Sequence, residues 1–122
     1  LPTLWNEKME EYLGVKPTTD TEGVLQDVHW SGGSFGYFPS YSIGNIYSAQ
    51  FAAAMERDGL KLDALIEEGD FTRIREWLGQ QIHFFGKMKS PAEIVKDATG
   101  ETIDASYLIR YFEQKYHEIY GI

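Results

Sequence analysis

The sequence has no cysteine, few positive charges and no long apolar run. Without cysteine, disulfides and thiolate sites for zinc or iron–sulfur clusters are excluded, and a reducing compartment fits. The 11 Lys and Arg face 19 Asp and Glu, for a net charge of -8, which argues against nucleic acid and anionic membranes as partners. No apolar run approaches the roughly 20 residues that span a bilayer, so we expect a cytoplasmic protein without a membrane partner.

What the sequence does contain is helical periodicity. A chain of 122 residues is about one domain by length, and we expect a single helical domain over 1–122. Apolar spacing and cap residues predict an all-α fold, a helical bundle with a short helical turn around 23–30. The helices are expected at about 4–13, from 39 or 41 to 58, and at 62–68, 71–85, 91–98 and 105–119. The expected N-caps are Thr3, Asp70, Ser90 and Asp104, and the expected C-terminal glycines are Gly14, Gly59, Gly69 and Gly100.

The helix expected over 39–58 carries many small residues, which would let a neighbouring backbone approach closely. They are Gly44, Ser48, Ala49, Ala52 and Ala53. Exposed contiguous apolar surface marks an interface, so we expect the isolated chain to self-associate as a homo-oligomer.

The residue types that would support a complete metal or nucleophile site are sparse. The only histidines are His29, His83 and His117, far apart and in no helical pairing, so we expect no metal site within the chain. There is no G-x-S-x-G motif. The "GGSFG" segment lacks the Lys–Ser/Thr and the preceding strand of a phosphate loop. The chain therefore holds, at most, part of an active site.

The segment 23–45 gathers hydrogen-bonding side chains beside permissive glycines, and it is the candidate site. Gln26 and His29 are three residues apart and would share a face on a helical turn, while Asp27 could orient a ring. Imidazole and phenol groups, here His29 with Tyr37 or Tyr41, commonly bind an oxyanion or a substrate carboxylate.

A structural alternative makes the same segment a glycine-rich connector. In that interpretation Phe35 and Phe38 plug into the core, and the glycines serve only the chain path.

The segment "GVLQDVHW" resembles the G-x-x-Q-D-x-H-W signature of the M32 family of zinc metallocarboxypeptidases. The flanking "LWNEKMEEYLGVKP", "SGGSFGYFPSYSIGNIYSAQF" and "SPAEIVKDATGE" agree with the same family. The similarity covers essentially all 122 residues, but only the C-terminal portion of such an enzyme.

The resemblance implies a two-lobed, all-α peptidase that often dimerises and removes C-terminal residues from peptides. Its zinc is held by the two histidines of H-E-x-x-H and a downstream glutamate, and none of these motif residues occurs here, so we expect the chain alone to be inactive. The resemblance also implies that His29 and Tyr37 bind the peptide near the scissile bond or stabilise its developing oxyanion. In zinc chemistry of this kind, a neutral His29 and the Tyr37 hydroxyl would share the charge of the oxyanion. Gln26, Asp27 and Tyr41 would contact the peptide substrate.

Two other interpretations remain open. The chain could be a stand-alone truncated relative that acts as a helical binding module, or a small independent enzyme that uses the glycine-rich loop. It begins at Leu1 rather than methionine, which fits either a trimmed initiator or a piece cut from a longer chain and favours the carboxypeptidase portion.

Overall fold

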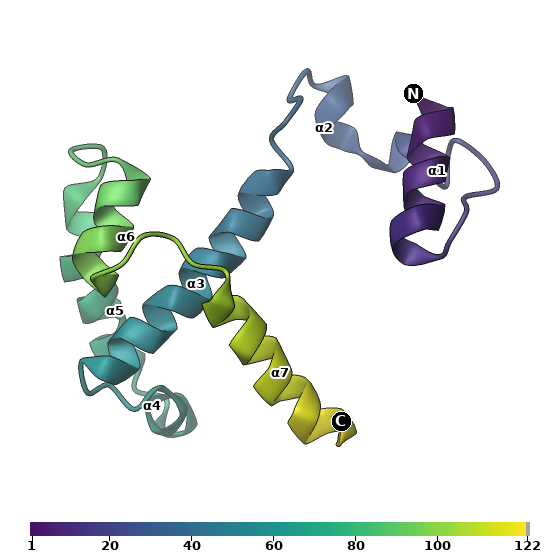
Figure 1. Cartoon of the computed structure of the whole chain (residues 1–122). Helices are drawn as coiled ribbons and strands as arrows, with labels where there is room; N and C mark the ends of the chain where they lie inside the picture. Colours follow the sequence, from purple (N-terminus) through teal and green to yellow (C-terminus); the bar gives the residue numbers. More distant parts are fainter. Residues whose placement is uncertain (122) are drawn as a thin grey trace. The chain divides into compact units, whose positions relative to one another are not determined.

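A computed structural model describes residues 1–121, and every regular element within that range is a helix (Figure 1). The all-α prediction is confirmed. The elements group into two compact units, residues 1–40 and the residues from 41 onward, and each unit is described by itself. The expectation of a single domain stays a prediction. None of the described helices is long and apolar enough to cross a membrane.

The first unit holds α1 (Pro2–Leu13), a 3-10 turn η1 (Val24–Gln26) and α2 (Val28–Ser31). The predicted Thr3 cap is wrong: α1 begins at Pro2, and no side chain caps it. Proline tolerates the first helical position because its missing N–H would have no partner there. The predicted end is confirmed, with Gly14 in the left-handed conformation at φ 66°.

The helical turn expected around 23–30 is divided in two at Asp27. This residue is extended (φ -83°, ψ 105°) and is the N-cap of α2, where its carboxylate accepts a hydrogen bond from the His29 backbone N–H. A side chain that caps one helix holds its own backbone outside the helical region. Gln26 and His29 therefore do not share the face of one continuous helical turn, and that part of the prediction is wrong.

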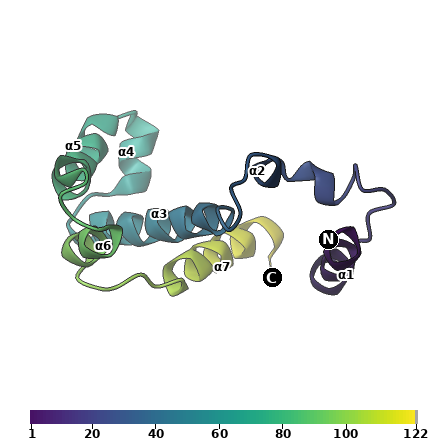
Figure 2. The same cartoon turned by 90° about the horizontal axis from the view of Figure 1, so that it is seen from above.

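The second unit is built around the long helix α3 (Pro39–Arg57), which begins just before the unit boundary. Its core joins Ala54 and Met55 of α3 to Trp77 of α5 (Phe71–Gln81) and Ala98 of α6 (Pro91–Thr99). Figure 2 shows α5 and α6 beside one end of α3. The Trp77 indole is anchored there because its Nε1–H donates to Asp58 Oδ2 at 2.9 Å.

The shorter helices end where their cap residues predict. α4 (Leu62–Glu68) closes on Gly69 in the left-handed region, and α6 begins with the Ser90–Glu93 capping box. Asp70 caps α5 as expected. The predicted continuation of α5 to 85 is wrong, because the helix stops at Gln81 and a separate 3-10 turn, η2 (His83–Phe85), follows.

A buried amide fixes the start of the last helix, α7 (Ser106–Tyr120). Gln50 on α3 is 1% exposed; its Nε2 donates to the Thr102 carbonyl at 2.9 Å, and its Oε1 accepts from the Asp104 N–H at 3.0 Å. Asp104 serves the helix start as expected, but from one residue before the N-cap: its carboxylate accepts from the N–H and hydroxyl of Ser106.

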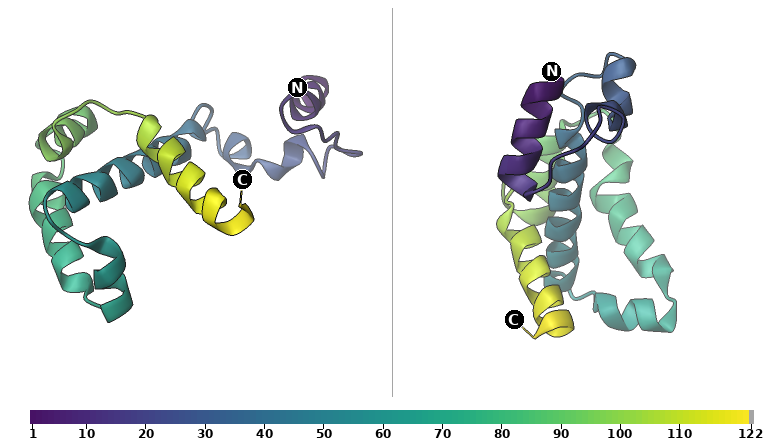
Figure 3. Two further views of the ribbon diagram at one scale, coloured as in Figure 1. Left: turned by 60° about the horizontal axis from the view of Figure 1, so that its bottom comes forward. Right: turned by 90° about the vertical axis from the view of Figure 1, so that its right-hand side faces the viewer.

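α7 itself has no buried residue. Figure 3 shows α7 starting beside α3; the two helices diverge in the left view and run in a similar direction in the right view. Beyond Leu108 its large apolar side chains are exposed, among them Tyr111, Phe112, Tyr116 and Ile119.

Candidate functional site

Four of the five predicted site residues lie in the first unit. Gln26 ends η1, Asp27 caps α2, His29 is in α2, and Tyr37 is in the connection that leads to α3. Tyr41 belongs to the second unit, as the third residue of α3, and is 52% exposed. The geometry of the four residues of the first unit is therefore described by itself.

The closest pair in this site is Asp27 with His29. Asp27 Oδ1 accepts the His29 backbone N–H at 2.7 Å and lies 2.8 Å from His29 Nδ1. The side chains are only 8% and 21% exposed, respectively. Burial by itself raises the pKa of Asp27, but the hydrogen bonds from the His29 backbone and ring together outweigh it and lower the pKa below its usual value. The carboxylate is thus ionised at neutral pH and acts only as an acceptor.

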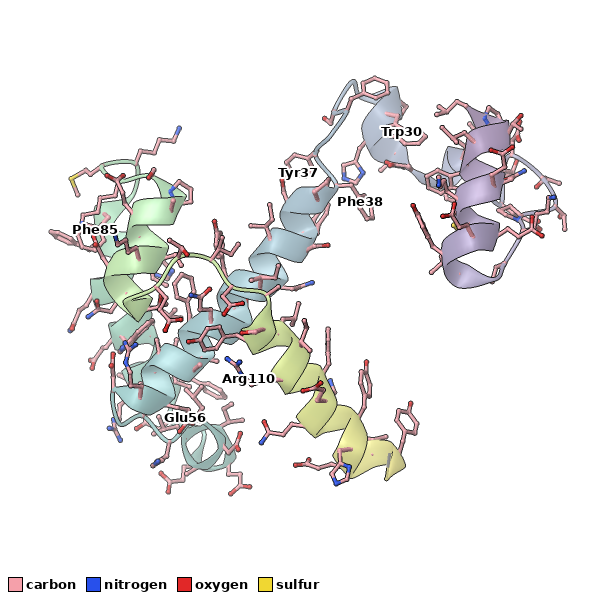
Figure 4. All side chains as sticks on the ribbon, in the orientation of Figure 1. Trp30, Tyr37, Phe38, Glu56, Phe85 and Arg110 are labelled. Atoms are coloured by element: carbon pink, nitrogen blue, oxygen red, sulfur yellow. The ribbon has the colours of Figure 1, made fainter. Side chains whose placement is uncertain are left out.

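Two aromatic rings hold the His29 imidazole from other sides. Tyr37 stacks on it with ring centroids 5.6 Å apart and an interplanar angle of 27°. Phe38 meets it edge-on at 5.6 Å and 89°. Figure 4 shows Tyr37 and Phe38 together in the connection between α2 and α3. The predicted association of imidazole and phenol is present, and their rings form one cluster.

The sequence did not predict the contact between Phe38 and His29. The connector interpretation placed Phe35 and Phe38 in the core, but their side chains are 72% and 59% exposed, so that prediction is wrong. Phe35 instead stacks on Trp30 at 6.3 Å. The helical pattern gives no signal for such contacts, because glycines at positive φ, such as Gly33 and Gly36, set the path of this connection.

A cavity of about 450 Å³ lies next to the His29 cluster within the first unit. Its lining includes Trp5 of α1 and Trp30 of α2, which meet edge-on at 5.5 Å. Gln26 and Asp27 are its polar lining residues. The remaining lining residues are Gly36, Phe38 and Pro39. A mostly apolar cavity with a few polar groups is the usual form of a small-molecule or side-chain pocket.

Gln26 lines this cavity but also has a local partner. Its Nε2 donates to the Thr21 carbonyl at 2.6 Å, which fixes the amide plane and leaves Oε1 as an acceptor. The substrate contacts predicted for Gln26, Asp27 and Tyr41 stay predictions.

The described residues do not fit a metal site. No group of three or more His, Cys, Asp and Glu side chains that could hold a metal ion occurs in residues 1–121. Around His29 the carboxylate contact is Asp27, which uses the same oxygen to cap α2. No reaction step is therefore assigned to a metal held by this chain.

Comparison with known proteins gives consistent matches. Carboxypeptidase 1 of Bacillus subtilis is 52% identical over 120 residues, which is 98% of this chain and 24% of the relative. Thermostable carboxypeptidase 1 of Thermus thermophilus is 41% identical over 99% of this chain and 24% of its own length. The chain thus spans about a quarter of the length of these relatives.

Solved structures agree with the sequence matches. The crystal structure of the M32 carboxypeptidase from Deinococcus radiodurans superposes with a TM-score of 0.94 at 38% identity, over 100% of this chain and 25% of that one. The family described as Carboxypeptidase Taq (M32) metallopeptidase matches residues 1–116. With nearly the whole chain matched in both sequence and fold, the protein belongs to the M32 metallopeptidase family.

Proposed function

We propose that this chain is the C-terminal region of a zinc-dependent carboxypeptidase that removes C-terminal residues from peptides in the cytoplasm. The whole of 1–122 would contribute substrate-groove residues to that enzyme. The chain would be inactive alone, because the metal site would come from other parts of the polypeptide. The observation that carries the proposal is the ordered cluster of Asp27, His29 and Tyr37 within a family match that spans a quarter of the relatives' length.

In this proposal His29 and Tyr37 bind the peptide near the bond that is cleaved and donate hydrogen bonds to the developing oxyanion. Gln26 and Tyr41 add contacts to the substrate. Preorganised donors lower a barrier because they need not reorient as charge develops. The stacking of Tyr37 on His29 supports such preorganisation, since each ring restricts the other.

The test uses a chimera in which this chain replaces the matching quarter of the Bacillus subtilis carboxypeptidase 1. The chimera should release the C-terminal residue of a peptide, whereas the isolated chain should not. His29→Ala or Tyr37→Phe should each lower kcat by about 10²–10³-fold while the zinc content stays normal, as for loss of one oxyanion donor. His83→Ala and Tyr12→Phe, both at exposed positions, are the matched controls. An unchanged kcat in both site variants would remove these residues from the mechanism.

A second candidate function is a helical interaction module that pairs with another copy of itself. Exposed α7 and the groove of about 550 Å³ between α3, α4 and α7 favour it. The groove joins small residues of α3, such as Ala49 and Ala52, to Tyr107 and Tyr111 of α7. Sedimentation of the isolated chain should then give a species heavier than 14.0 kDa. Phe112→Asp on the exposed face of α7 should reduce association, and a strictly monomeric wild-type chain would contradict this candidate.

A further inference from the structure

The contact between Asp27 and His29 determines which ring nitrogen carries the proton. We propose that Asp27 is a positioning residue that holds the proton of neutral His29 on Nδ1. This inference rests on the substrate role proposed for His29 and specifies its chemistry. Neutral His29 then offers a lone pair at Nε2, and only the imidazolium form donates a hydrogen bond there.

The N-cap interaction of α2 fixes the position of the Asp27 carboxylate. Asp27 Oδ1 accepts a hydrogen bond from the His29 backbone N–H at 2.7 Å and also lies 2.8 Å from His29 Nδ1. The backbone bond is the N-cap interaction of α2, so the position of the carboxylate is set by the helix rather than by the ring. At 8% exposure, water competes weakly for this carboxylate. The ring is thus drawn to an acceptor that is already in place.

The ionised Asp27 carboxylate decides which nitrogen of the neutral His29 ring carries the proton. An ionised carboxylate has no hydrogen to donate, so the nitrogen that it contacts must carry one. In neutral histidine the two ring nitrogens share a single proton, and a hydrogen bond made by one nitrogen decides the state of the other. With Nδ1–H directed at Asp27, Nε2 is unprotonated in the neutral ring.

Two neighbouring aromatic rings restrict the orientation of the His29 imidazole. Tyr37 stacks on one face of the imidazole, and the Phe38 ring is perpendicular to the imidazole in an edge-to-face contact. Rotation of the ring by half a turn, which would exchange the two nitrogens, would break the Asp27 contact while the stacked Tyr37 limits the motion.

The chemical consequence differs from the sequence-based expectation that neutral His29 stabilises the oxyanion. A lone pair on Nε2 would repel an oxyanion and would instead accept a hydrogen bond from a substrate N–H. Donation to the oxyanion requires protonated His29, whose positive charge is balanced by Asp27. Tyr37 carries a hydroxyl donor in either state, so the two residues of the cluster would respond differently to pH.

Nitrogen NMR of the imidazole rings tests the assignment without any measurement of activity. In the ¹⁵N-labelled 122-residue chain, at a pH where the rings are neutral, long-range ¹H–¹⁵N correlations identify the protonated nitrogen. His29 should show protonated Nδ1 and unprotonated Nε2. Exposed His83 is the internal reference and should show the Nε2–H form that predominates in free histidine. His29→Gln assigns the signal, and the Nε2–H form at His29 in the wild-type chain would overturn the proposal.

Substitution of the carboxylate separates positioning from simple folding. Asp27→Ala removes the acceptor, and the neutral His29 ring should revert to the Nε2–H form. Asp27→Asn keeps an oxygen that can cap α2 but removes the charge, so it should reduce the Nδ1–H population while the fold is kept. Asp63→Asn, an exposed carboxylate in the first turn of α4, should change neither. An unchanged His29 tautomer in both Asp27 variants would also overturn the assignment.

The NMR result and the chimera answer separate questions. A chimera whose activity does not depend on His29, together with the Nδ1–H tautomer, would refute the proposed function and leave the Asp27 assignment intact. In an active chimera, Asp27→Asn should change the pH dependence of kcat/KM, whereas Asp63→Asn should not. A variant that only loosened the fold would lower the rate at every pH alike.

Discussion

Replacement of Gln50 by leucine should remove the polar link between α3 and the residues that lead into α7. The side chain is 1% exposed and makes three hydrogen bonds, two at 2.9 and 3.0 Å to backbone groups of Thr102 and Asp104 and one at 3.2 Å to the Thr99 hydroxyl. Leucine has a similar size, so the substitution tests polarity rather than volume.

The magnitude follows from the groups that lose partners. The Thr102 carbonyl and the Asp104 N–H lose their bonds to Gln50, whereas the Thr99 hydroxyl keeps its donation to the Val95 carbonyl at 2.8 Å. At about 1 kcal/mol per hydrogen bond, and more for a buried group left unpaired, the loss for Gln50→Leu is about 3 kcal/mol. For a domain of this size that lowers Tm by roughly 10 °C.

Thermal and urea unfolding followed by circular dichroism measure the effect. Gln80→Leu, on the exposed face of α5, is the matched control and should unfold like the wild type. Gln50→Glu should be worse than leucine at neutral pH because it buries a charge that faces a carbonyl, and it should recover as the carboxyl is protonated on acidification. A Gln50→Leu variant as stable as the control would refute the reasoning.

Other substitutions should change stability in urea unfolding for distinct reasons. Gly44→Ala in α3 should stabilise by about 0.5–1 kcal/mol, since no atom lies within 4 Å of the added Cβ and alanine restricts the unfolded chain. Gly100→Ala should destabilise by about 1–2 kcal/mol, because the φ of Gly100 is +82°. Met55→Ala truncates a buried core side chain and should destabilise by about 3 kcal/mol. The hydrogen bond from the Trp77 indole lowers the pKa of Asp58. This bond should therefore stabilise the fold at pH values above the ordinary aspartate pKa, and its effect should be lost as the pH falls through the lowered pKa. The difference in unfolding free energy between Asp58→Asn and wild type should shrink over the same pH range.

Helix ends could be predicted where the signal is local. Gly14, Gly69 and Gly100 close their helices in the left-handed conformation, and Ser90 forms its capping box with a residue three positions away. Each of these interactions lies within a few residues of the chain, so the sequence pattern and the structure have the same physical cause.

Long-range and competing interactions could not be predicted in this way. Gln50 lies within a helix of small residues, and its partners are 49 to 54 positions away, so only the folded packing shows that it is buried. Asp27 could have continued a helical turn, but its carboxylate caps α2 instead. The resemblance identified His29 and Tyr37 as a pair; their stacked geometry and the contact of Asp27 with His29 Nδ1 appear only in the structure.

The link at Gln50 also gives α7 a mechanical property. A helix of 15 residues is about 22 Å long, yet α7 is joined to the buried interior only where it begins. The helix is therefore held at its N-terminal end, and a tilt of about 10° there would move its C-terminal end by about 4 Å. The buried Gln50 amide would restrain such a movement from its bonds to the residues that precede α7.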